Sequence, residues 1–197
     1  MTRCYSDLVP IRHPPLPDVW LISDARNDAA LERILARLPR GSGLIFRHYH
    51  LSPEVRRTRF GRLARVARRH GHRLVLSGPP RQARRWRADG AYGSPGRLAR
   101  GPQTLRLATV HSLGELAQAD RARADAVLIS PVFPTRSHPG APALGPVRFR
   151  LLAGRSRVPV IALGGMTAHR AHAMGVSKWA AIQGLGERPT GVFSLHS

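Results

Sequence analysis

One loop of this sequence gathers the residue types that bind anions. The segment Ser130–Gly145 ("SPVFPTRSHPGAPALG") follows the apolar run "ADAVLI" and contains Thr135, Arg136, Ser137 and His138 in a row. Hydroxyl groups and cationic side chains donate hydrogen bonds to anions, and the surrounding prolines restrict the backbone. A restrained loop that leaves a strand is where an α/β protein commonly carries its binding groups.

The ends of the other expected strands carry similar chemistry. They present hydroxyls, glycines and cations but few acids: Asp24, Arg47, Tyr49, Ser77, Thr109, His111, Gly164–Gly165 and Gln183–Gly184. Glycines let backbone N–H groups approach phosphate oxygens closely, and Thr167 is a suitable N-cap for a helix that follows Gly165. We therefore predict a phosphate site between 135–137, 164–165 and 183–184.

The ten histidines and the cysteine content give no metal or nucleophile motif. His48 and His50 would share a strand face, and His169 and His172 are spaced for a helix, but no carboxylate or cysteine completes either pair. We interpret all four as surface or supporting histidines and predict no metal ligands. Cys4 is the single cysteine, and the G-x-S-x-G motif of hydrolases is absent.

Strand and helix patterns alternate along the whole chain, which is typical of a parallel sheet. Helical patterns such as 28–38 and 112–124 separate the apolar runs, and Ser112 with Glu115 forms a candidate capping box. Eight units predict a compact (βα)8 TIM barrel, with a doubly wound sheet as the alternative. We expect an N-terminal extension over 1–18 and one domain over 19–197, whose final segment, with Pro189 and Gly191, makes a poor helix. The expected strands are 19–23, 44–48, 73–77, 90–93, 106–110, 126–130, 158–163 and 179–184.

The charge is strongly positive, with a formal net charge of +21, and all but one of the 32 basic residues are arginine. The arginines are scattered, and in the helical pattern 53–71 an apolar face of Phe60, Leu63, Ala64 and Ala67 leaves them on the solvated side. We therefore favour surface charge over nucleic-acid binding. No apolar run is long enough for a membrane span and no leader pattern is present, so we expect a cytoplasmic protein.

The same loop resembles the thiamine phosphate synthase and thiazole tautomerase family. "ADAVLISPVFPTRSHPGAPALG" followed by "VPVIALGGM" is similar to the family's "GADYVGVGPVFPTxTK" and "IPVVAIGGI", and the order of the remaining segments agrees from about Val19 to Leu185. The resemblance implies a (βα)8 barrel that joins a pyrimidine diphosphate to a thiazole phosphate and releases pyrophosphate with Mg²⁺. It implies thiazole-phosphate contacts at Thr135, Arg136, Ser137, Gly165, Ile182 and Gln183, with Gly164 and Gly184 beside them.

At the diphosphate end the sequence departs from the family. Arg47 matches the arginine of "QLREK", and Ser77, Thr109 and His138 stand at or beside expected diphosphate contacts. The Mg²⁺ carboxylates, however, are replaced by Gly78 and Arg97, so we predict no cofactor.

Three functions stay open on this reading. The first is a synthase-like transferase, in which Arg47 and His138 assist the leaving group. The second is a tautomerase-like enzyme that uses His111 or His138 for proton transfer. The third is a non-catalytic paralogue that binds a phosphorylated thiazole or thiamine phosphate. The oligomeric state is not indicated.

Overall fold

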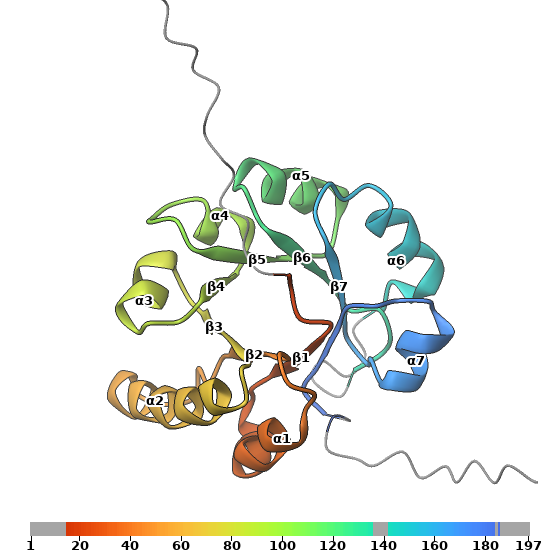
Figure 1. Ribbon diagram of the computed structural model, residues 1–197. Helices are drawn as coiled ribbons and strands as arrows, with labels where there is room; N and C mark the ends of the chain where they lie inside the picture. Colours follow the sequence, from red (N-terminus) through yellow and green to blue (C-terminus); the bar gives the residue numbers. More distant parts are fainter. Residues whose placement is uncertain (1–14, 136–141, 184, 186–197) are drawn as a thin grey trace, which may run out of the picture.

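Eight parallel strands close into a barrel in the computed structural model, which describes residues 15–135, 142–183 and 185 (Figure 1). Each strand pairs with the next in sequence, and β8 pairs with β1 to close the ring, with Trp20 beside Ala180. The fold is therefore a compact (βα)8 barrel, and the doubly wound alternative is wrong. The strands are β1 Val19–Ile22, β2 Gly43–Phe46, β3 Arg73–Ser77, β4 Gly90–Gly93, β5 Leu105–Val110, β6 Ala126–Ile129, β7 Val160–Leu163 and β8 Trp179–Ala181.

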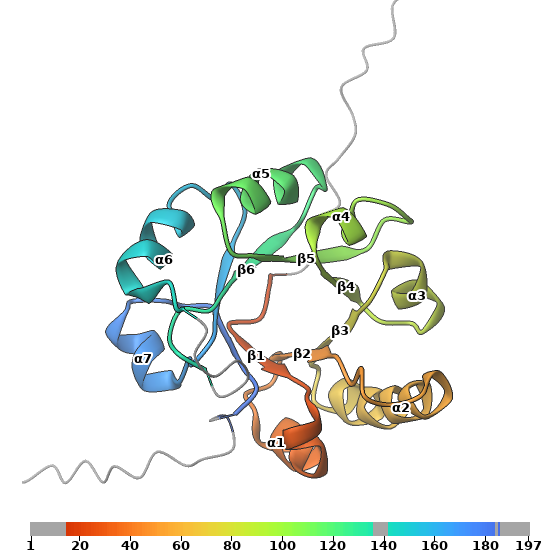
Figure 2. The same cartoon turned by 180° about the vertical axis from the view of Figure 1, so that it is seen from behind.

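Helices cover the outside of the barrel between consecutive strands, as the two opposite views show (Figures 1 and 2). The longest, α2, begins after the N-cap Ser52 with Pro53 in its first turn, where a missing N–H costs nothing. The 3₁₀ segment η1 covers Ala25–Ala30. The α-helices are α1 Leu31–Arg37, α2 Pro53–Arg69, α3 Pro80–Arg85, α4 Pro95–Leu98, α5 Leu113–Arg121, α6 Gly145–Ala153 and α7 Ala168–Ala173.

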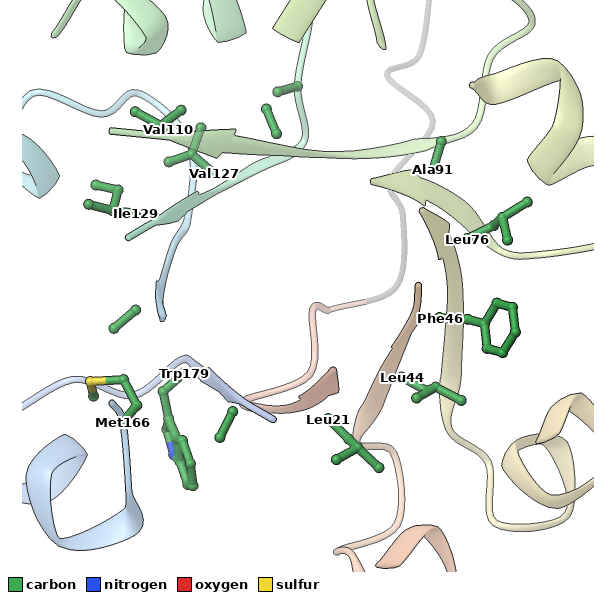
Figure 3. Packing of buried hydrophobic residues seen from close by; sticks show 14 of the residues in the cluster. Leu21, Leu44, Phe46, Leu76, Ala91, Val110, Val127, Ile129, Met166 and Trp179 are labelled. Carbon is green, nitrogen blue, oxygen red and sulfur yellow. The ribbon is translucent and has the colours of Figure 1, made fainter. Parts of the chain in front are cut away.

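The alternation of side chains along each strand divides the core into two layers. Trp20, Ile22 and Ile45 belong to the cluster that fills the barrel. Their neighbours Leu21 and Phe46 belong to the larger cluster between strands and helices. Figure 3 shows Phe46, with Leu44 and Leu76, pointing away from the barrel interior. The filled interior leaves the ends of the strands as the place for a ligand.

Several strands end earlier than the sequence predicts. His48 and Ser130 lie beyond their strands, and β8 stops at Ala181. At β2 the cause is local, because His48 has a φ of 44°, a left-handed conformation that no strand accommodates. The division into an extension over 1–18 and one domain over 19–197 stays a prediction, and the doubtful last helix lies outside the described residues. Within the described part of the chain, no helix has the length and apolar character needed to cross a bilayer.

Candidate functional site

A pocket of about 1140 Å³ opens at the carboxyl ends of the strands. Residues at or beyond the ends of seven of the eight strands line it, and β3 is the exception. Six arginines and His111 are the charged or titratable cationic groups of its lining, and none of the described lining residues is an aspartate or glutamate. The arginines are Arg26, Arg33, Arg37, Arg47, Arg97 and Arg170. A mouth with this charge attracts anions.

A glycine turn after β7 and the loop after β6 form one wall of the pocket. The amides of Val132 and Phe133 donate to the carbonyls of Leu163 (2.9 Å) and Gly164 (3.0 Å), so loop and turn are held together. Gly164 and Gly165 have φ values of 98° and 62°, and a Cβ on Gly164 would lie 2.6 Å from Cα of Pro131. Only glycine fits both positions without strain. Thr135 lines the pocket beside them.

Helix α7 follows the glycine turn and begins as the sequence predicts. Thr167 is its N-cap and accepts a hydrogen bond from the amide of Arg170 at 3.2 Å. The Arg170 guanidinium donates to the carbonyl of Gly165 and lies 4.5 Å from the ring centroid of Phe133. Arg170 thus ties the turn to the loop while it lines the pocket.

Ile182 and Gln183 line the pocket where β8 meets β1. The side-chain Nδ2 of the buried Asn27 donates to the carbonyls of Ile22 (3.0 Å) and Ile182 (2.6 Å). Its Oδ1 accepts from the backbone N–H of Asp24 (2.9 Å). The carbonyl of Ile182 is therefore already engaged. Asn27 was not anticipated from the sequence, because one asparagine in a polar segment gives no signal of a bridge between the first and last strands.

Arg47 and Thr109 also line the pocket, whereas Ser77 does not. Ser77 is 1% exposed, and its hydroxyl is hydrogen-bonded to the hydroxyl of Tyr49. The Arg47 guanidinium lies 5.6 Å from the Tyr49 ring centroid. Tyr49 thus supports the Arg47 cation and occupies the Ser77 hydroxyl that we predicted for a diphosphate.

Tyr92 at the end of β4 is a site residue that the sequence analysis missed. It packs against the cluster inside the barrel and lines the pocket. Burial raises the pKa of its phenol, and a hydrogen bond with Thr109 acts in the opposite direction. Tyr92 therefore stays protonated and can donate a hydrogen bond. The sequence offered one signal, because Tyr92 stands next to Gly93 in an expected strand whose side chains alternate between the two faces.

His111 lines the pocket together with a carboxylate partner outside the lining. Oε2 of Glu115 accepts hydrogen bonds from the His111 amide (2.6 Å) and its Nδ1 (2.9 Å). Ser112 is the N-cap of α5 and accepts from the Glu115 amide, as predicted. The predicted reciprocal bond of a capping box is replaced, because the Glu115 side chain turns to His111 rather than to Ser112.

Of the histidines interpreted as surface or supporting residues, His48 is a supporting one, whereas the interpretation of Arg56 as surface charge is wrong. His48 is 1% exposed, with Nδ1 2.7 Å from Oγ of Ser23 and Nε2 2.8 Å from Oδ1 of Asp28, so it is a buried structural residue. Arg56 is 9% exposed and does not face solvent. Its position four residues before Phe60 continues the apolar stripe of α2, a spacing that already indicated burial. His169 and His172 are exposed as expected.

The residues at the expected metal positions do not fit Mg²⁺. Arg97 lines the pocket, and no group of three potential metal ligands occurs among the described residues. Asp24 and Asp28 are engaged elsewhere, with Arg26 and with His48 and Arg59 respectively. A hard cation that prefers carboxylate oxygens has no such donors in the described lining. Arg136, Ser137, His138 and Gly184 lie outside the described residues.

Fold and site together define a (βα)8-barrel protein with a cationic pocket at the carboxyl ends of its strands. Residues 19–185 match the family model described as thiamine monophosphate synthase, so the chain belongs to that family.

Individual proteins of known sequence or structure are similar to this chain. A segment of 59 residues is 37% identical to "Putative thiamine-phosphate synthase 2" of Aquifex aeolicus, covering 30% of this chain and 32% of that protein. The solved thiamine phosphate pyrophosphorylase of Pyrococcus furiosus is 21% identical, with a TM-score of 0.70 over 83% of this chain and 84% of that one. The pyrophosphorylase of Bacteroides thetaiotaomicron is 12% identical, with a TM-score of 0.56 over 84% and 82% of the two chains. At these identities the two structures support the fold.

Proposed function

We propose that this protein binds a thiazole phosphate in the pocket and couples it to a pyrimidine diphosphate with release of pyrophosphate. The observation that carries the proposal is the lining itself, which combines a glycine turn, hydroxyls and arginines without an acid among its described residues. Because the cations converge on a pocket of about 1140 Å³, a small phosphorylated ligand fits better than a nucleic-acid strand. A pocket somewhat above the usual few hundred to about 1000 Å³ also has room for two substrates.

The two anionic groups have different partners in this proposal. The thiazole phosphate lies against the turn at Gly164–Gly165 with Thr135 and Gln183, where amide and hydroxyl groups can donate to its oxygens. The diphosphate lies toward Arg47 and Thr109. Negative charge builds up on the diphosphate as its bond to the pyrimidine methylene breaks, and fixed guanidinium groups stabilise that charge. No step is assigned to a metal, because the described lining offers it no carboxylate.

A coupling assay with both precursors, run with Mg²⁺ and with a chelator, tests the function. We expect thiamine phosphate and pyrophosphate to form in both conditions. Gly165→Asp should lower thiazole-phosphate affinity by at least about tenfold relative to Gly165→Asn, because the two variants share shape and backbone strain and differ in one negative charge. The comparison requires that Gly165→Asn still binds the ligand measurably, and equal measurable affinities of the two variants would then remove the phosphate from this turn.

One observation favours a second candidate. His111 and Glu115 form a hydrogen-bonded pair at the pocket, which is an arrangement suited to proton transfer in a thiazole tautomerase. Tautomerisation of the thiazole precursor that is abolished in His111→Gln, together with no coupling by the wild type, would support this candidate instead. Ligand binding without either reaction would indicate a non-catalytic paralogue.

A further inference from the structure

Arg56 is a buried cation whose contacts with the other described residues include no acid. It projects from α2 and is 9% exposed, with its guanidinium carbon 5.5, 5.4 and 5.3 Å from the ring centroids of Phe46, Tyr49 and Trp86. An arginine cannot shed its proton, so the charge remains in the interior and the aromatic faces stabilise it. Burial of a charge is costly unless hydrogen bonds or other partners compensate for the lost water, so the partners of this guanidinium show what it does at that place.

The guanidinium of Arg56 joins two neighbouring strand ends. Its Nε donates to the carbonyl of Arg47 at 2.7 Å, and its Nη2 donates to the carbonyl of Ser77 at 2.8 Å. These carbonyls lie at the exits of β2 and β3, which are adjacent in the barrel. The hydroxyls of Tyr49 and Ser77 connect the same two exits a second time. Arg56 therefore holds the backbone of Arg47 from the side of α2.

The backbone of Arg47 is also held from the opposite side. The backbone amide of Arg47 donates to Oγ of Ser23 at 2.8 Å, and the same Oγ is hydrogen-bonded to the His48 ring. His48, the next residue, has a φ of 44°. A non-glycine residue persists in this conformation when its surroundings fix it, and such positions occur at functional sites. Both peptide groups of Arg47 are thus engaged, while its side chain lines the pocket.

We propose that Arg56 is a positioning residue that fixes Arg47 for an anionic group of the ligand, with Ser23 as the opposing support. This inference rests on the proposed function, because it assumes that Arg47 binds the diphosphate. It assigns a role to the one buried arginine of α2, which the sequence pattern had placed with the other arginines on the solvated side. Arg56 acts on the ligand through the geometry of Arg47. The shape of the Arg56 side chain should therefore affect ligand affinity as well as its charge.

Calorimetric titration of pyrophosphate into the whole chain tests the inference. Arg47→Met should weaken binding by roughly tenfold or more, the effect of losing a charged hydrogen bond. Arg56→Lys should lose nearly as much as Arg56→Met, because a lysine keeps the charge but does not reproduce the guanidinium fork that spans the two carbonyls. Arg57→Met, the adjacent residue outside the pocket lining, should leave the affinity unchanged.

A double-mutant cycle separates positioning from a general structural effect. If Arg56 acts through Arg47, Arg56→Met should add little to the loss already caused by Arg47→Met, and Ser23→Ala should show the same non-additivity. Ser23→Ala changes a single buried oxygen, so it keeps the test available if the Arg56 variants do not fold. Circular dichroism and melting temperature report folding for every variant.

The failures of the two proposals are distinguishable. An unchanged affinity in Arg47→Met overturns the diphosphate site itself. If Arg47→Met weakens binding, then full affinity in Arg56→Lys, or fully additive losses in both cycles, overturns the positioning role of Arg56 while the site stands.

Discussion

At the scale of single residues, His48 links the stability of the protein to pH. Burial lowers its pKa, while the hydrogen bond to Asp28 acts against this effect. Burial also lowers the pKa of His72, and its buried Nδ1 has no hydrogen-bond partner among the described residues. In the folded chain both rings are therefore neutral at a pH where an unfolded chain would already bind protons.

We expect the free energy of unfolding to fall as the pH drops from about 7 to about 5, by up to about 1.4 kcal/mol per pH unit for each histidine. The unfolded state takes up more protons in this window, so the stability is present above the ordinary histidine pKa and is lost below it. Urea unfolding of wild type and of His48→Asn, which tolerates a positive φ, measures the slope. An identical slope in the variant would contradict the assignment.

At the scale of elements, one side chain supports the closure of the barrel at its short last strand. β8 has three residues, and Asn27 bridges its end to that of β1 through two carbonyls. Asn27→Ala should lower the free energy of unfolding by about 1–3 kcal/mol, because it leaves buried polar groups without partners. Gln118→Ala, at an exposed position of α5, is the control, and equal stability of the two variants would exclude the bridge.

The elements themselves were predictable, and much of the site was not. Alternation of apolar runs with helical patterns indicates eight strand–helix units, and strand ends such as Arg47, Thr109 and Gly164 follow from that pattern. Arg56 was misassigned because its charge outweighed its spacing from Phe60. Ser77 does not line the pocket because its hydroxyl is hydrogen-bonded to Tyr49, and no local sequence pattern predicts that contact. Contacts between residues on different units are set by packing, which the sequence of either unit does not contain.

At the scale of the whole molecule, the pocket should bind its ligand without a divalent cation. The lining arginines repel Mg²⁺, and the nearby acids Asp24 and Asp28 are already paired. We expect the affinity for pyrophosphate to change less than about threefold across a Mg²⁺ series that begins from metal-stripped protein, since a required metal would change it by far more. A strong Mg²⁺ dependence that disappears in Asp24→Asn would contradict this prediction and identify Asp24 as a ligand.

The described lining of the pocket, which includes no acid, affects the stability of the protein without ligand. Six guanidinium groups line the pocket, and although Arg26 is paired with Asp24, the mutual repulsion of the others destabilises the protein without ligand. Replacement of an exposed member such as Arg33 by glutamine should therefore stabilise the free protein, although it weakens the field that draws the ligand in. Fewer arginines around the pocket would raise the stability of the free protein but lower its affinity for the ligand. Selection for a more heat-resistant variant would therefore tend to reduce ligand binding.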